Sequence, residues 1–185
     1  MSLPEYVVDV NAIVDRARQQ YEALVASPQG AVLVAEGAQL ALFTPQDLQA
    51  AFEGVKEIEI EVRDATDAIE PPEQIADLHD LFFDFDDESF TSAQDALATR
   101  AGTAADWEEL SVTPEMAAYR AALAEDKQRC TDFEAALDAT AERAVFGNTP
   151  WIPSELTEIV DAVIGCAGYP ENPEDVYRPL PTSSP

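Results

Sequence analysis

The stretch that decides the fold is "TPQDLQAAFEGVKEIEIEVRDATDAI", residues 44 to 69. Large apolar residues recur in it at every seventh position: Leu48, Val55, Val62 and Ile69. Further apolar residues lie between them, which is the spacing of a helix that buries one face. The segment "KEIEIEV" at 56 to 62 alternates like a strand when taken alone, and a strand is the alternative there. Because the seven-residue spacing continues on both sides of it, we predict a helix.

Proline marks the start of this stretch and of four others. Proline is favoured in the first turn of a helix, where its missing N–H is not needed and its backbone angle is already helical. The five starts are "LPEY" at 3 to 6, "TPQD" at 44 to 47, "PPEQ" at 71 to 74, "TPEM" at 113 to 116 and "IPSE" at 152 to 155. Each precedes a run of apolar residues with helical spacing, so the sequence predicts four long helices and a shorter fifth one.

Short breaks between long helices favour antiparallel neighbours. We therefore predict an all-α fold in which residues 4 to 169 form an antiparallel up-and-down bundle. The third helix is expected to run from Pro72 past Leu97, with a bend near Ser89. For residues 31 to 43 we favour a helix, with a hairpin that turns at Glu36 and Gly37 as the alternative. The Pro-rich tail, residues 170 to 185, is predicted to be extended or disordered.

The composition is strongly acidic. The 185 residues include 37 Asp and Glu against 10 Lys and Arg, which gives a net charge of -27. Direct binding of nucleic acid needs a basic surface and is not expected. Because 46% of the residues are hydrophobic, the charge indicates a folded chain with an acidic surface. A saline or extracellular environment, a cationic partner, or imitation of a polyanion would each produce such a surface.

No apolar run is long enough to cross a bilayer, so no transmembrane segment is predicted. The most apolar stretch, residues 31 to 43, is too short and contains Glu36. No signal-peptide pattern opens the sequence either.

The two cysteines, Cys130 and Cys166, are candidates for a disulfide. If the fourth and fifth helices pack antiparallel, Cys130 and Cys166 lie about 24 and 20 Å from the turn between them, and so at a similar level. A bond closing this loop would stabilise the fold by about 3 to 4 kcal/mol and would indicate an oxidising compartment. The alternative is two unrelated buried thiols.

The acidic segment 70 to 90 contains the only histidine, His79. Together with Asp84 and Asp87 it is a weak candidate for a metal site. The acidic residues recur at intervals of three and four, however, which is typical of one solvated helix face, with His79 at its border. The segment lacks the glycine and glutamate of a calcium loop. We expect no metal and no cofactor.

No catalytic motif accompanies this histidine. The sequence has no phosphate-binding glycine loop, no dinucleotide-binding motif and no GxSxG. Pairs of carboxylates are present as in any acidic protein, but nothing singles one out. We predict no catalytic residues and no enzymatic activity. The remaining enzymatic hypothesis, which we rank third among the possible functions, is a hydrolase that uses surface carboxylates.

Trp107 and Trp151 lie at predicted helix junctions, in "TAADWEEL" and "NTPWIPSEL". In one interpretation their side chains are buried and close the ends of the bundle. In the other they are exposed and form aromatic contacts with a partner.

Three pieces of sequence, "PPEQIADLH" at 71 to 79, "WIP" at 151 to 153 and "GCAGYP" at 165 to 170, resemble uncharacterised exported helical proteins and lipoproteins of bacteria. The resemblance is one of style over about residues 60 to 170. It implies a location in the cell envelope and a paired cysteine, and it implies no catalytic residues.

Together these observations predict a non-enzymatic acidic helical protein that acts as an interaction or ligand-binding module. Its partner would be a protein or a small ligand, with a cationic one favoured by the charge. The expected location is extracytoplasmic, meaning periplasmic, surface-anchored or secreted, with the cytoplasm as the alternative. An acidic decoy that mimics DNA and binds a nucleic-acid-binding protein is the alternative function. The oligomeric state is left open.

Overall fold

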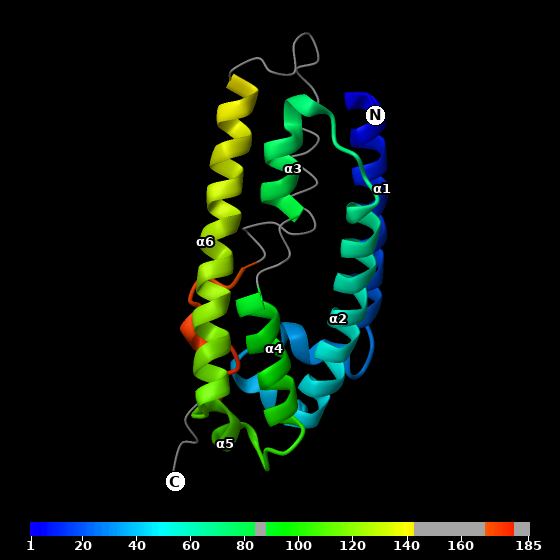
Figure 1. Cartoon of the computed structure of the whole chain (residues 1–185). Helices are drawn as coiled ribbons and strands as arrows, with labels where there is room; N and C mark the ends of the chain where they lie inside the picture. The colour runs from blue at the N-terminus through cyan, green and yellow to red at the C-terminus, as the bar shows by residue number, and fades with distance from the viewer. Residues whose placement is uncertain (84–87, 143–168, 180–185) are drawn as a thin grey trace. The chain divides into compact units, whose positions relative to one another are not determined.

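The computed structural model describes residues 1 to 83, 88 to 142 and 169 to 179 of the chain (Figure 1). Within these residues the backbone forms helices and turns and no strand, so the predicted all-α class is confirmed. The α-helices are α1 (Leu3–Val25), α2 (Pro45–Asp67), α3 (Ala76–Phe83), α4 (Glu88–Ala101), α5 (Trp107–Ser111) and α6 (Pro114–Glu142). The 3₁₀-helices are η1 (Gly30–Val34), η2 (Gly37–Leu42), η3 (Glu73–Ile75) and η5 (Pro173–Asp175).

The proline starts of α2 and α6 work as the sequence predicts. At α2 the Thr44 N–H donates to Asp47 Oδ2 at 2.7 Å, and the Asp47 N–H donates to Thr44 Oγ1 at 3.3 Å. This reciprocal pair is a capping box, which satisfies backbone donors that have no partner inside the helix. At α6 the Met116 N–H donates to Thr113 Oγ1 at 3.2 Å. The helix α2 also runs through residues 56 to 62, so the strand alternative is wrong.

The chain divides into two compact units. Unit 1 contains residues 1 to 19, 58 to 87 and 125 to 169, and unit 2 contains residues 20 to 57, 88 to 124 and 170 to 185. Each unit therefore combines segments that are distant in the sequence. The helices α1, α2 and α6 each contribute residues to both units.

The core of unit 1 is built around the first four turns of α1. Tyr6, Val7, Val10 and Val14 of that helix are all at most 4% exposed. Thr66 of α2 is 1% exposed, and its hydroxyl donates to the carbonyl oxygens of residues 62 and 63 at 3.0 and 2.9 Å. A buried hydroxyl is costly unless it is bonded, and the local backbone supplies both acceptors.

The core of unit 2 is larger and includes several aromatic rings. Its largest fully buried side chains are Val32, Leu40, Leu48, Leu97, Leu110 and Met116, each less than 2% exposed. They come from η1, η2, α2, α4, α5 and α6. Full burial of one such side chain contributes about 1.5 to 3 kcal/mol, so this shared core holds the six elements together.

Residues 31 to 43 differ from both predictions. They form two short 3₁₀-helices, η1 and η2, instead of one α-helix or a hairpin. Ala35 and Glu36 between them are extended, and Gly37 has a φ of 51°. Glycine tolerates this left-handed backbone, whereas a continuous right-handed helix could not include it. The glycine therefore divides the apolar segment.

The third predicted helix is also divided. The structure has η3 and α3 before residue 84 and α4 after residue 87, and residues 84 to 87 lie outside the described part. The short helix α5 lies in the connection between α4 and α6. Asp106 caps it by accepting a hydrogen bond from the Glu109 N–H at 2.8 Å. The predicted fifth helix, from about residue 153, lies outside the described residues.

Residues 169 to 179 are not an isolated tail. Pro173–Asp175 forms η5, and Pro173 and Tyr177 are buried in unit 2. In Figure 1 this orange-red segment runs beside α6. The prediction of an extended or disordered tail therefore does not hold for this part, because the Tyr177 ring packs among other aromatic rings.

Candidate functional site

The only histidine is paired with a tyrosine inside unit 1. The Tyr6 hydroxyl of α1 and Nδ1 of His79 of α3 are hydrogen-bonded at 3.0 Å. The two rings meet edge to face, with 5.7 Å between their centres and 69° between their planes. His79 is 9% exposed and Tyr6 is 4% exposed. The pair thus joins two helices in the interior of the unit.

Burial sets the protonation of this pair. Desolvation lowers the pKa of His79, although Asp80 and Asp67 act in the opposite direction. Burial likewise raises the pKa of Tyr6. Each shift favours the neutral form, because a charge is poorly solvated in the interior. At neutral pH both side chains are therefore neutral, and the pair is a packed hydrogen-bonded contact.

The metal hypothesis finds no support in the described part of the chain. No three His, Cys, Asp or Glu side chains among the described residues are grouped so that they could hold an ion. The other two candidate ligands, Asp84 and Asp87, lie outside the described residues.

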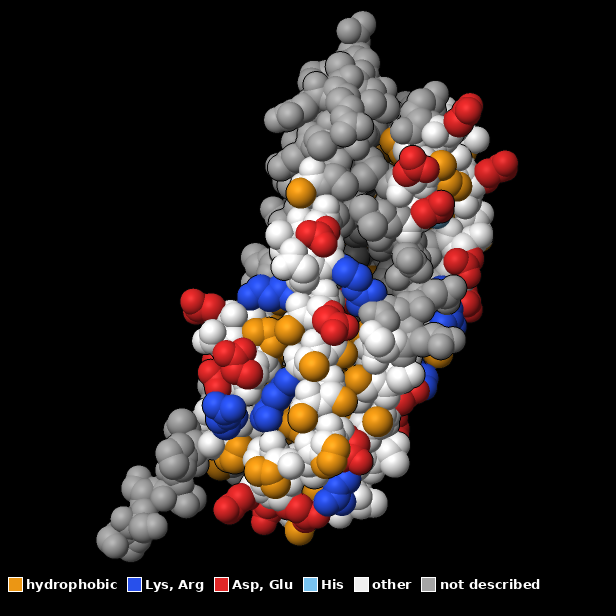
Figure 2. Space-filling view, turned by 60° about the vertical axis from the view of Figure 1, so that its left-hand side comes forward, with side chains coloured by type: hydrophobic (Ala, Val, Ile, Leu, Met, Phe, Trp, Pro, Cys, Tyr) orange, Lys and Arg blue, Asp and Glu red, His pale blue; other side chains and the backbone are white. Residues whose placement is uncertain are grey.

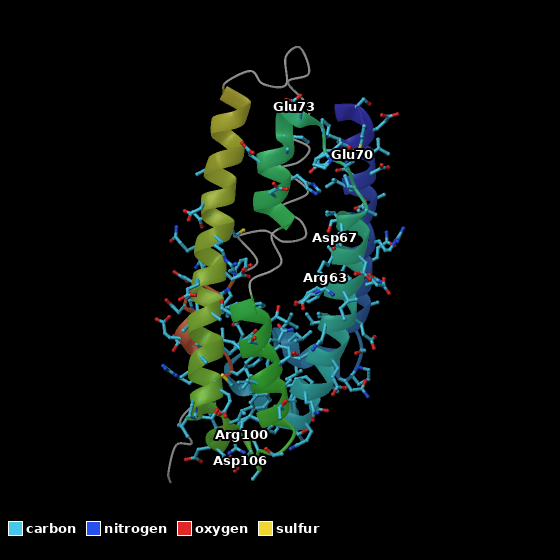
Figure 3. All side chains as sticks on the ribbon, in the orientation of Figure 1. Arg63, Asp67, Glu70, Glu73, Arg100 and Asp106 are labelled. Carbon is cyan, nitrogen blue, oxygen red and sulfur yellow. The ribbon has the colours of Figure 1, made fainter. Side chains whose placement is uncertain are left out.

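Exposed acidic residues surround the turn between α2 and α3. We call Asp64, Asp67, Glu70, Glu73, Asp77 and Asp80 the acidic corner, and all six are exposed. Figure 3 shows Asp67 on α2, Glu70 in the connection that follows and Glu73 at its far end. Arg63 is the only Lys or Arg in the sequence between positions 58 and 83.

The acidic corner keeps its charge available. None of the ion pairs between described residues uses one of its six carboxylates. Like charges three or four residues apart reinforce one another's potential, and salt screens it only beyond about 8 Å at physiological ionic strength. This surface can therefore attract a cationic ligand.

Trp107 is an interior residue of unit 2. It is 7% exposed, and its indole Nε1–H donates to the Phe43 carbonyl oxygen at 2.8 Å. This corrects its candidate role as an exposed partner contact, because both its ring and its N–H are used inside the unit. Trp151, the other candidate, lies outside the described residues.

Two residues that the sequence analysis missed are central to unit 2. Tyr177 is 6% exposed, and Arg120 of α6 binds the backbone of the residue before it. The available signal was weak: Tyr177 is the only aromatic residue between positions 170 and 185. Nothing in the spacing of α6 indicates that Arg120 binds a segment more than fifty residues away.

The cysteine prediction is only half covered by the described residues. Cys130 lies on α6 and is 9% exposed. Cys166 lies outside the described residues, so the disulfide stays a prediction.

None of the helices described is long and apolar enough to cross a membrane. Comparison of the chain with protein-family models, with curated proteins and with solved structures found no match.

Proposed function

We propose that the protein is a non-enzymatic interaction module that binds a cationic partner, a protein or a small ligand, through the acidic corner. The observation that carries this proposal is the exposure of all six carboxylates without an ion pair between described residues. The chain carries a net charge of -27, so its few bases cannot neutralise this surface. A surface of one sign raises the rate at which an oppositely charged partner arrives.

A charge-neutralised variant tests this proposal. Asp64→Asn, Glu70→Gln and Glu73→Gln together remove three charges from the acidic corner. The matched control, Glu22→Gln, Glu57→Gln and Glu108→Gln, removes three charges from exposed positions elsewhere. The probe is a fluorescent lysine octapeptide, whose binding is followed by anisotropy at several salt concentrations.

We expect the corner variant to bind the peptide at least about tenfold more weakly than the control variant at low salt. The difference should shrink as salt is added, because these charges are exposed. Equal losses in both variants would mean that the peptide responds only to net charge, and the acidic corner would then not be a binding site.

The alternative function is an acidic decoy for a nucleic-acid-binding protein. Such a decoy presents carboxylates along a surface as DNA presents its phosphates. On the face seen in Figure 2, acidic side chains lie among apolar and basic ones and form no continuous band. This pattern favours the interaction module. Competition with DNA for a DNA-binding protein would be the outcome that favours the decoy.

The proposal includes an extracytoplasmic location, with the cytoplasm as the alternative. Its support is the predicted cysteine pair and the acidic surface. We also propose the antiparallel up-and-down arrangement for the long helices, which the connection of α1 to α2 through the short elements η1 and η2 supports. Distances between spin labels on α1, α2 and α6 would test this arrangement.

A further inference from the structure

The C-terminal segment of the described chain packs against aromatic rings of unit 2, and we call the surface formed by Phe52, Trp107, Tyr119 and Arg120 the groove. We call residues 173 to 178, "PEDVYR", the strap. The Tyr177 ring stacks on Trp107 of α5 with 5.8 Å between ring centres, and on Tyr119 of α6 with 6.4 Å. Phe52 of α2 meets it edge to face at 6.4 Å. Three helices thus supply the walls of one pocket for one aromatic side chain.

A guanidinium group fixes the backbone of the strap next to this pocket. Arg120 donates from Nε and Nη2 to the Val176 carbonyl oxygen, at 3.0 and 2.8 Å. Its Nη1 donates to the Ser111 carbonyl oxygen at 3.1 Å, which orients the group. Hydrogen bonds from a charged donor are stronger than neutral ones, and two of them to one oxygen define where the carbonyl must lie. The groove therefore recognises a main-chain carbonyl followed by an aromatic ring.

The strap holds this position with a strained backbone. Tyr177 has a φ of 51°, in the left-handed region that a residue with a side chain rarely adopts. That conformation lowers the affinity of the strap for the groove by about tenfold, compared with a ligand whose backbone is unstrained. A segment that places the same ring and carbonyl without this strain would bind the groove more tightly.

We propose that this groove is a peptide-binding site for a segment of a partner protein, and that the strap is its intramolecular competitor. The ligand class is a turn that begins at proline and carries an aromatic side chain directly after the carbonyl bound by Arg120. A backbone contact combined with a side-chain pocket is a common way for a protein to recognise a peptide. This site uses other residues than the acidic corner and does not depend on it.

Competition by the strap sets the affinity that a partner would show. A tethered segment acts at an effective concentration on the order of millimolar, so a partner peptide binds only the fraction of molecules whose strap is released. A weakened strap must therefore increase the affinity for an added peptide. This increase in affinity is expected only while the residues that line the groove are unchanged.

The experiment uses the full chain and a fluorescent peptide of residues 170 to 180, "PENPEDVYRPL". The Tyr177→Ala chain should bind this peptide saturably and at least about tenfold more tightly than the wild-type chain. Adding Arg120→Ala to that chain should weaken binding by at least about tenfold, because a charged donor is lost. Adding Arg129→Ala, an exposed arginine of the same helix, should leave binding unchanged. A peptide with Ala in place of its Tyr should not bind.

Circular dichroism first establishes that each variant is helical. If Tyr177→Ala lowers helicity, Pro173→Ala replaces it, since this change loosens the strap and leaves the aromatic ring in place. Equal peptide binding by the wild-type and released chains, or no saturable binding by a helical released chain, would overturn the proposal. Wild-type dimers that Tyr177→Ala abolishes would identify a second copy as the occupant and overturn the assignment to a partner protein.

Discussion

Tyr6 and His79 lie 73 positions apart in the sequence and are hydrogen-bonded at 3.0 Å in the interior of unit 1. The bond joins α1 to α3 at a point where a titratable group is almost fully buried. Asp67 of α2 and Asp80 of α3 act on the same imidazole. The stability of unit 1 therefore depends on the protonation of one histidine.

The first prediction concerns pH. Burial lowers the pKa of His79 below 6.5, so the unfolded chain takes up a proton before the folded chain does. The contribution of neutral His79 to the free energy of unfolding is fully present above pH 6.5. It is lost as the pH falls from 6.5 towards the pKa of His79 in the folded chain. His79→Gln keeps polar atoms for Tyr6 and does not titrate. Urea denaturation of both proteins between pH 7.5 and 5 should show a steeper loss in the wild type.

The comparison with His79→Gln is needed because protonation of the many carboxylates also changes stability in this range. That effect is common to both proteins. Parallel stability curves for the two proteins would contradict the role assigned to the histidine.

The second prediction concerns Trp107. Trp107→Phe keeps an aromatic ring in the core of unit 2 but removes the donor to the Phe43 carbonyl oxygen. An acceptor left without its partner costs about 1 to 3 kcal/mol. Denaturation in urea should show a free energy of unfolding reduced by this amount. A loss below about 0.5 kcal/mol would mean that water replaces the indole N–H.

The third prediction compares two glycines. A Cβ at Gly30 would lie 2.0 Å from the Leu24 carbonyl oxygen, which is backbone and cannot move aside. A Cβ at Gly102 would lie 2.3 Å from Gln49 Oε1, the end of a flexible side chain. Gly30→Ala should therefore destabilise by about 1 to 3 kcal/mol. Gly102→Ala should change stability by less than about 0.5 kcal/mol.

Thermal unfolding of the two alanine variants measures this contrast under identical conditions. A loss below about 0.5 kcal/mol for Gly30→Ala would show that the turn after α1 moves to accept a side chain.

The fourth prediction concerns the cysteines. If Cys130 and Cys166 are bonded, alkylation of the denatured, unreduced protein should leave its mass unchanged. Reduction should then lower the free energy of unfolding by about 3 to 4 kcal/mol, because the loop of about 35 residues is no longer closed. Two alkylated thiols without reduction would exclude the disulfide and remove its support for an extracytoplasmic location.

Local sequence features predicted much of the secondary structure. The proline starts and the threonine caps act within one turn, and they place the beginnings of α2 and α6 correctly. The seven-residue spacing also identified α2 through a segment that alternates like a strand. Gly37 shows where such reasoning fails, since the spacing favoured one helix through a residue with a left-handed backbone, and only the alternative hairpin placed a turn there.

The candidate sites divide in the same way. The acidic corner could be predicted from the sequence, because its carboxylates follow one another at intervals of three and four residues. Their grouping requires no contact between distant segments. The strap is not visible in the sequence, since its partners come from α2, α5 and α6. Trp107 was ambiguous for the same reason, as its hydrogen-bond acceptor lies 64 positions away.

The sequence by itself determined the helical class, the starts of α2 and α6 and the surplus of negative charge, because these depend on residues within a turn or on composition. Only the tertiary structure decided that Tyr6 meets His79, that Trp107 is interior and that Tyr177 fills a groove beside Arg120. Such contacts arise when distant segments share one core. The free energy that selects them comes from burying apolar surface, which has no direction along the chain.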